Sequence, residues 1–243
     1  MGPIVRKQLR KFLITMRTKF LITMRTKSLI KERRSQIMKK FWSVITVIVT
    51  VFAAVASFAV NPNSSAQAAS NKKVLVVYFS RTQGVYGGRS KRGNTARVVD
   101  FIQQKTNADT YEIVPKKAYP KSYDRTTQVA HREQNQNARP ASKGKLPDVS
   151  KYDTVFIGGP IWWGEYPMVV RTFLDKESGL NGKTLIPFTT NEGSGLGNTR
   201  QVLKKQFPKS KVRQGFTATG NTVKNNPNRV RSQVNSWLDD LGY

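Results

Sequence analysis

Lys73-Val74-Leu75-Val76-Val77-Tyr78-Phe79-Ser80-Arg81-Thr82, completed by Gly93-Asn94-Thr95, is the stretch that decides the fold of this chain. Its first part is an apolar, β-branched run, typical of a strand that is buried on both faces of a sheet. The run ends in hydroxyl and glycine residues, and apolar spacing then predicts a helix that begins at Asn94. A strand, a polar loop and a helix N-terminus in this order favour phosphate binding, because free N–H groups and the helix dipole face the anion.

The side chains of this loop predict a neutral phosphate site. Ser80, Thr82 and Thr95 supply hydroxyl groups, and Asn94 supplies an amide. The segment that begins at Gly88 resembles a nucleotide-binding P-loop, but Asn94 stands where the phosphate-binding lysine would be. We therefore expect a bound phosphate group without nucleotide hydrolysis.

The rest of the chain alternates strand-like and helix-like segments. Strands are expected at 110–114, 153–158, 183–190 and 212–217, helices at 167–176, 196–207 and 229–241, and one further helix within 116–150. This alternation predicts an α/β fold with a doubly wound, five-stranded parallel sheet between two helical layers. Ligands of such sheets bind at the carboxyl ends of the strands, where the polar loops of this chain fall.

A second loop, at 158–167, follows the third predicted strand and contains Trp162 and Trp163 among three glycines. Two adjacent tryptophans cannot both point into one core. One explanation is that one is buried and the other packs at an interface; the other is that they form an aromatic wall for a flat ring. With the phosphate loop and a third, glycine-rich loop at 191–197, the second explanation predicts a site for a phosphorylated planar heterocycle.

These three loops, in this order, resemble those of the flavodoxin family, and the resemblance covers residues 73–242. It implies the strand order 2-1-3-4-5 and non-covalently bound FMN. By this resemblance the phosphate would be held by Ser80, Thr82, Asn94 and Thr95. The isoalloxazine ring would be bordered by Pro160, Ile161, Trp162, Trp163 and Gly164, and closed on its other side by Asn191, Glu192, Gly193, Ser194 and Gly195.

The chain departs from the family pattern in an insertion at 83–92, which is rich in glycine and basic residues. We expect Arg81 or Lys91 to reach the phosphate or a partner.

The chain also departs from the family pattern in its positive charge. The first 70 residues hold 13 of the 42 basic and one of the 14 acidic residues, which leaves 29 basic and 13 acidic residues after position 70. Such a balance favours anionic cell surfaces or membranes as partners over nucleic acid, since no nucleic-acid-binding motif accompanies it.

The first part of the chain reads as a leader. Residues 1–37 contain a tandem octapeptide and are either a basic membrane-surface segment or, as we expect, sequence upstream of a true start at Met38. Residues 38–68 match a signal peptide, with two lysines, an apolar run at 41–60 and a small-residue site that ends at Ala68. Cleavage there would export a domain of residues 69–243; without cleavage, the apolar run would anchor it in a membrane.

The absence of cysteine excludes disulfides and thiol redox chemistry, so electron transfer would depend on a bound organic cofactor. A single histidine, His131, argues against a metal site and is expected on the solvated surface. The sequence therefore predicts an extracytoplasmic FMN protein that exchanges electrons with a redox partner or a small, quinone-like acceptor. The alternatives are an FMN-dependent NAD(P)H:quinone reductase, and a flavin-free fold that binds anionic surface polymers. No catalytic residue is predicted.

Overall fold

The computed structural model describes residues 73–243. The predicted leader at 1–37, the signal peptide at 38–68 and the apolar run at 41–60 lie outside the described residues. Within 73–243, no helix is both long enough and apolar enough to cross a membrane.

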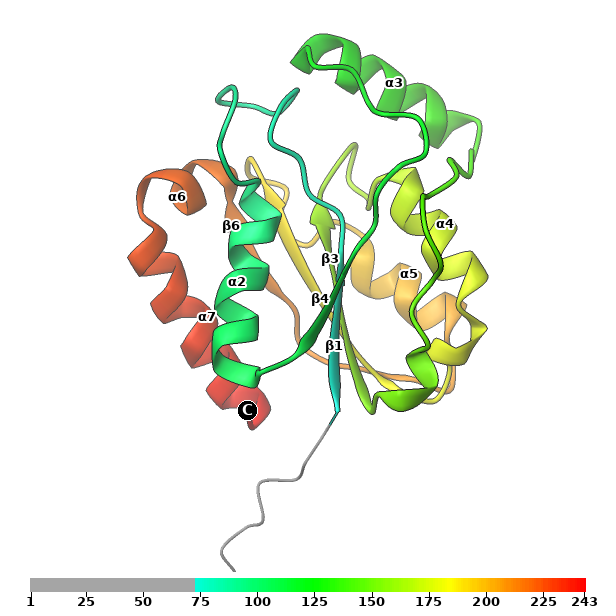
Figure 1. Ribbon diagram of the computed structural model, residues 1–243, viewed down its shortest axis with the longest axis vertical. Coiled ribbons are helices and arrows are strands. Elements are labelled where there is room, and N and C mark those ends of the chain that lie inside the picture. Colours follow the sequence, from blue (N-terminus) through cyan, green and yellow to red (C-terminus); the bar gives the residue numbers. More distant parts are fainter. Residues whose placement is uncertain (1–72) are drawn as a thin grey trace, which may run out of the picture. The chain divides into compact units, whose positions relative to one another are not determined.

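A parallel sheet forms the centre of the domain (Figure 1). Its strands are β1 (Val74–Tyr78), β2 (Asp109–Glu112), β3 (Thr154–Pro160), β4 (Thr184–Asn191), β5 (Lys211–Val212) and β6 (Phe216–Thr219). They lie in the order β2-β1-β3-β4-β5, and β6 also pairs with β4. The predicted doubly wound fold and strand order are confirmed.

Helices cover both faces of the sheet (Figure 1). On one face lie α2 (Asn94–Thr106), α6 (Gly220–Asn225) and α7 (Pro227–Leu241); on the other lie α4 (Met168–Lys176) and α5 (Thr199–Gln206). Short 3-10 turns occupy Val149–Lys151 and Ser178–Leu180. Alternate residues of β1 serve the two faces, because side chains along a strand alternate: Val76 packs into the α2/α7 core, and Val77 into the α4 core.

The predicted fifth strand, 212–217, is wrong in one respect, since it is split into β5 and β6. Both halves pair with β4: Leu185 lies opposite Val212, and Phe188 lies opposite Phe216. The two β4 residues are three positions apart and their partners are four positions apart, so the outer strand carries one extra residue. Pro187 lies between the two pairings and has no N–H to donate across the sheet, which interrupts the hydrogen-bond ladder. Gly215 lies at the break, where a Cβ atom would come within 2.6 Å of the Pro187 carbonyl oxygen.

The helix expected within 116–150 is α3 (Tyr123–Asn135), and it does not pack flat on the sheet. It lies across the carboxyl ends of the strands, as Figure 1 shows at the top of the molecule. Only Thr126 and Ala130 of this helix are buried. Because so little of α3 belongs to either core, its inner face is available to cover a site at the edge of the sheet.

Candidate functional site

The turn from β1 into α2 is held by Ser80. Its Oγ accepts a hydrogen bond from the N–H of Ala96 (3.1 Å) and so caps the helix from outside. Gly93 lies against this turn so closely that a Cβ atom would be 2.2 Å from Ser80 Oγ and 2.6 Å from the Arg81 carbonyl oxygen. Only glycine fits there, which explains the Gly-Asn-Thr start of α2.

The next two residues, Asn94 and Thr95, face the carboxyl edge of the sheet. The buried hydroxyl groups of Thr95 and Thr190 form a hydrogen bond of 2.8 Å, which joins the start of α2 to the end of β4. The side-chain oxygen of Asn94 is buried and has no hydrogen-bond partner within residues 73–243. A buried polar atom without a partner points to a missing one, since such atoms are nearly always hydrogen-bonded in folded proteins.

The tryptophan loop is a tight hairpin. The N–H of Trp162 donates to the carbonyl oxygen of Glu165 (2.8 Å), and the N–H of Glu165 donates back to Trp162 (3.1 Å). The two residues between them have positive φ angles, 52° at Trp163 and 81° at Gly164, which is the pattern of a type I′ turn. An ion pair between Glu165 and Arg171 anchors the hairpin. A positive φ is strained for tryptophan, so contacts around the hairpin must stabilise this conformation.

The two indoles have different surroundings. The indole of Trp162 is half-buried and packs edge-on against Phe79 and Tyr119, with ring centroids 5.7 and 5.0 Å away. That of Trp163 is 55% exposed, donates from Nε1 to the carbonyl oxygen of Thr127 (3.1 Å), and lies 4.4 Å from the ring of His131. The histidine is exposed, as predicted, but it packs on the indole. These contacts join α3 to the tryptophan hairpin.

The third loop is closed by the side chain of Asn191. Its Oδ1 accepts hydrogen bonds from the N–H groups of Gly193 (2.7 Å) and Gly195 (3.1 Å), and its Nδ2 donates to Thr217 (2.7 Å). The amide therefore sets the loop geometry, and the glycines at 193 and 195, with φ of 124° and 60°, allow the turn. Asn191 acts here mainly by shaping the loop.

Arg81 connects the phosphate loop to α3. Its guanidinium donates to Thr126 Oγ1 (2.9 Å) and to the carbonyl oxygen of Pro120 (2.6 Å), and it lies 5.5 and 5.9 Å from the rings of Tyr119 and Trp162. Burial lowers the pKa of Arg81 below its ordinary value. None of the ion pairs within residues 73–243 includes it. Arg81 is therefore a half-buried cation without an acidic partner.

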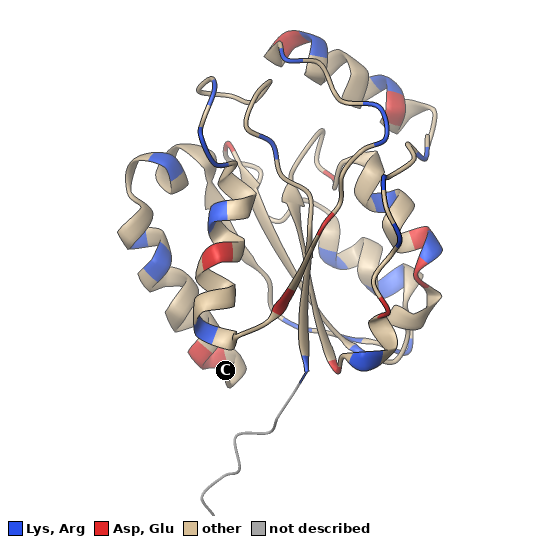
Figure 2. Cartoon of the chain, in the orientation of Figure 1, with Lys and Arg blue, Asp and Glu red and all other residues tan. Residues whose placement is uncertain are grey.

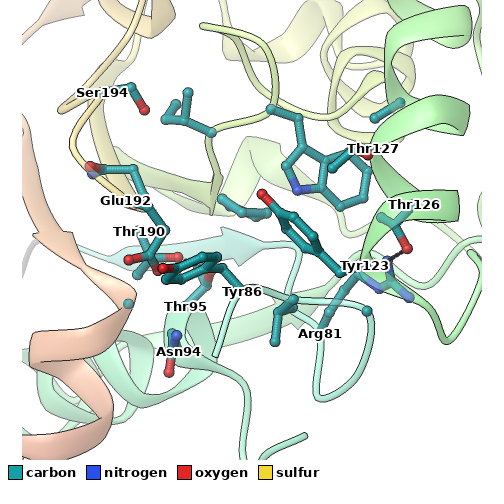
Figure 3. A pocket seen from close by; sticks show the side chains of 18 of the residues that line it. Arg81, Tyr86, Asn94, Thr95, Tyr123, Thr126, Thr127, Thr190, Glu192 and Ser194 are labelled. Carbon is teal, nitrogen blue, oxygen red and sulfur yellow. Dashed lines mark hydrogen bonds between the residues drawn. The ribbon is translucent and has the colours of Figure 1, made fainter. Parts of the chain in front are cut away.

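A cavity of about 530 Å³ lies between these loops and α3, and Figure 3 shows its walls. Ten of the predicted site residues line it: Arg81, Asn94, Thr95, Pro160, Ile161, Trp162, Trp163, Asn191, Glu192 and Ser194. Five do not: Ser80, Thr82, Gly164, Gly193 and Gly195. Ser80 caps α2, the three glycines shape the turns, and Thr82 is exposed at the base of the insertion.

The walls also contain residues that the sequence did not reveal. They come from the insertion, from α3 and from the starts of neighbouring elements: Gly84, Val85, Tyr86, Tyr123, Thr126, Thr127, Ala130, Thr190 and Gly220. The signal that the sequence offered for these walls was the presence of two tyrosines, Tyr86 and Tyr123, in otherwise polar segments. Both are exposed in the structure. Their contribution depends on where α3 lies, which the periodicity of the helix does not determine.

Glu192 is the one acidic residue in the cavity wall. Burial raises the pKa of its carboxyl, while hydrogen bonds from the backbone N–H groups of Gly220 and Asn221 act in the opposite direction. A Cβ atom at Gly220 would lie 2.4 Å from Glu192 Oε1 and 2.5 Å from Asn94 Nδ2. The absence of a side chain at Gly220 therefore lets the loop after β4 approach the start of α2. No cluster of acidic residues or His within 73–243 has the arrangement of a metal site.

Comparison with known proteins agrees with this geometry. The family model for flavodoxin matches residues 73–240. The chain belongs to the flavodoxin family. This family assignment confirms the resemblance found in the sequence and supports FMN as the cofactor. A search of curated proteins found no match to the chain.

Several solved structures are similar to this chain. A protein of Bacteroides eggerthii that has been assigned as a flavoprotein is 32% identical and has a TM-score of 0.55; the match covers 71% of this chain and 99% of that one. A similarly assigned protein of Bacteroides uniformis is 28% identical, with a TM-score of 0.55 and coverage of 69% and 98%. A flavoprotein of Lactobacillus acidophilus, solved with FMN, is 18% identical, with a TM-score of 0.49 and coverage of 63% and 97%.

Proposed function

We propose that this flavodoxin-family domain binds FMN in the cavity at the carboxyl edge of the sheet and transfers electrons outside the cytoplasm. One observation carries the proposal: three loops that are distant in sequence line a single cavity. Asn94 and Thr95 come from the first, the two tryptophans from the second, and Glu192 from the third. The volume of about 530 Å³ is within the usual range for cofactor sites.

The residues present fit the chemistry of FMN. Near the start of α2, the Thr95 hydroxyl and the Asn94 Nδ2 can donate hydrogen bonds to a phosphate. The buried oxygen of Asn94 lacks a donor, which an anionic phosphate cannot supply but a hydroxyl group of the ribityl chain can. The wall formed by Trp162 and Trp163 offers flat apolar surfaces for an aromatic ring. The two ends of the cavity therefore differ in polarity as the two ends of the cofactor do.

When bound, FMN would supply one- and two-electron redox chemistry. The protein would bind and orient it and exclude water from part of the ring. Thr95 and Thr190 share one hydrogen bond between two hydroxyl groups, so one hydroxyl hydrogen remains to be donated to a ligand. Arg81 would place a positive charge in the same wall as Trp162, where it would favour negative charge on a bound ligand.

The cavity favours a small acceptor over a purely protein-to-protein relay. It extends beyond the three cofactor loops to Tyr86, Tyr123 and the underside of α3. A small acceptor would enter at this end of the cavity, where Tyr86 and Tyr123 are exposed to solvent. An FMN-dependent quinone reductase would use the same space, and bleaching of the purified yellow protein by NADH or NADPH would distinguish it from an electron carrier that needs another donor.

The phosphate end is tested by comparing FMN with riboflavin. We expect Asn94→Ala to lose most of the preference for FMN over riboflavin, because the amide lines the cavity at the helix start. Thr82→Ala is the matched control, since Thr82 was predicted from sequence to bind phosphate but does not line the cavity. Titration of the FMN-free protein with both ligands measures the preference. Equal loss of both ligands in Asn94→Ala would contradict the phosphate assignment.

The location is tested separately. The signal-peptide prediction expects the exported protein to begin at Ala69, which N-terminal sequencing of protein from the culture medium and cell envelope would show. Protein that retains residues 41–60 would be membrane-anchored instead. Both results leave the FMN proposal to be decided by cofactor release and identification from the purified domain.

A further inference from the structure

A second cavity adjoins the first and is built by the insertion. It has a volume of about 290 Å³ and lies between the loop at 83–89 and the start of α3. The two cavities share Gly84, Val85, Tyr86 and Tyr123 as walls. A ligand placed in the second cavity would therefore extend along a shared wall toward the proposed cofactor.

The shared wall is aromatic and open to solvent. The rings of Tyr86 and Tyr123 pack edge to face, with centroids 6.0 Å apart, and the two residues remain 63% and 46% exposed. In the cavity view of Figure 3 both rings project into the opening. Exposed aromatic rings that converge on a cavity are typical of a binding surface for a planar ligand.

The outer part of the second cavity is positively charged. Arg89 and Lys121 line it, and no acidic residue does. Neither cation takes part in an ion pair within residues 73–243. Asp124 follows Tyr123 in sequence but is not part of the wall. Figure 2 shows that the loop before α2 carries basic residues and no acidic ones.

The insertion is held in place as a wall. The N–H of Ser90 donates to the carbonyl oxygen of Thr82 (2.9 Å), and Lys224 Nζ donates to that of Gly87 (2.8 Å). A Cβ atom at Gly84 would lie 2.6 Å from the carbonyl oxygen of Pro120, so the loop also fits closely against the segment before α3. Contacts to both α3 and α6 therefore fix the loop that carries Arg89.

We propose that this second cavity binds the electron acceptor, and that the acceptor is a planar aromatic molecule with an anionic substituent, such as a sulfonated or carboxylated quinone. The tyrosine pair would contact the ring system, and Arg89 and Lys121 would bind the anion. This assignment rests on the proposed function. Reduction of a quinone held there to the hydroquinone takes two electrons and two protons. Anionic reduced FMN would supply both electrons and one proton as it returned to the oxidised form, and solvent at the exposed wall would supply the second proton.

The test measures equilibrium binding to the oxidised, FMN-containing full chain by calorimetry, and repeats it with the FMN-free protein. The probes are anthraquinone-2-sulfonate and the neutral 2-(hydroxymethyl)anthraquinone. We expect the sulfonate to bind about five- to tenfold more tightly, the effect of two partly exposed ion pairs. Arg89→Gln with Lys121→Gln should abolish this difference, and Tyr86→Ala should weaken both probes.

The matched control is Lys209→Gln with Lys211→Gln, which removes the same charge from the opposite edge of the sheet. Lys209 lies beside Asn181, and Lys211 pairs with Thr184 at the start of β4. Equal binding of the two probes, or an equal effect of the control pair, would overturn the anionic assignment. An unchanged affinity in Tyr86→Ala would overturn the ring contact.

FMN content is measured independently, so that the two proposals can be told apart. Failure of the probes to bind to a yellow, FMN-containing protein refutes this inference alone, whereas a protein that does not bind added FMN refutes the proposed function.

Discussion

The hydrogen bond between Thr95 and Thr190 provides a quantitative test of how the cofactor edge of the sheet is held together. The two hydroxyl oxygens are 2.8 Å apart, and the residues are only 2% and 4% exposed. Thr95→Val keeps the shape of the side chain but removes its hydroxyl. Thr190 is then left with a buried hydroxyl and no partner, which is the costly way to lose a hydrogen bond.

The expected loss follows from this burial. Leaving a buried polar group unpaired costs roughly 1–3 kcal/mol, so we expect Thr95→Val to lower the free energy of unfolding by about 2 kcal/mol. For a domain of this size, such a loss lowers the melting temperature by roughly 4–8 °C. Thr190→Val should cost about as much, because it leaves the hydroxyl of Thr95 unpaired in the same way.

The double variant separates the bond from the shape of the two side chains. With both hydroxyls replaced, no buried polar group is left unpaired, so Thr95→Val/Thr190→Val should cost clearly less than the sum of the single variants, with a coupling of about 1–2 kcal/mol. Urea unfolding of the FMN-free protein measures each corner of the cycle. Strict additivity of the two changes would refute the view that each hydroxyl is the partner on which the other depends.

Three other measurements test individual side chains of the site. Arg81→Gln should lower the second one-electron potential of bound FMN by tens of millivolts; one unit charge acting over ~7 Å at an effective dielectric constant near 40 corresponds to ~50 mV. Arg81→Lys should restore most of the potential, and no change in a redox titration would exclude a charge effect. Trp163→Gly should keep the hairpin but speed hydrogen exchange in α3 about tenfold, since it removes the indole's hydrogen bond to Thr127 and its contact with His131. Unchanged exchange would mean that the other contacts of α3, such as that between Arg81 and Thr126, are enough to hold it. The pKa of the Glu192 carboxyl is raised in the folded protein, so the folded protein binds a proton there more tightly than the unfolded chain does. Stability should therefore fall as pH rises from the ordinary carboxyl pKa through the folded value. Glu192→Gln should flatten this dependence of the melting temperature on pH, and an identical dependence in the variant would mean that other groups cause it.

The central fold was predictable because its elements have simple periodicities. The continuous apolar run of β1 and the helical spacing of apolar residues in α2 are each enough to predict the element from a short stretch of sequence. The split of the outer strand was missed, although Pro187 was visible within the fourth predicted strand. Its consequence depends on which neighbour its missing N–H would have faced, and that is known only once the sheet is assembled. The helix α6, which was not predicted, has only six residues and too few to show a period.

The candidate site was predictable where chemistry and position coincide, and less so elsewhere. Asn94 was singled out because it starts a helix after a polar loop, and the tryptophans because they are adjacent in a glycine-rich loop; all three line the cavity. The sequence assigned Ser80 to the phosphate but could not show that its Oγ also accepts a hydrogen bond from a backbone N–H of α2, because residue type does not reveal this contact. The contribution of α3 could not be predicted, because only two residues of this helix are buried and its sequence therefore does not indicate which surface it covers.

The insertion at 83–92 leaves the domain and returns to it at a single point. The N–H of Ser90 donates to the carbonyl oxygen of Thr82, and Gly93 lies against the backbone of Arg81, so the two ends of the loop lie side by side. Closing a longer or shorter loop between fixed ends changes the free energy only slowly with length. Its length and sequence can thus diverge without disturbing the start of α2. The scaffold is in this sense modular: the part of the cavity wall formed by Gly84, Val85 and Tyr86 can change, while the walls formed by the start of α2, the tryptophan hairpin and the loop after β4 are kept.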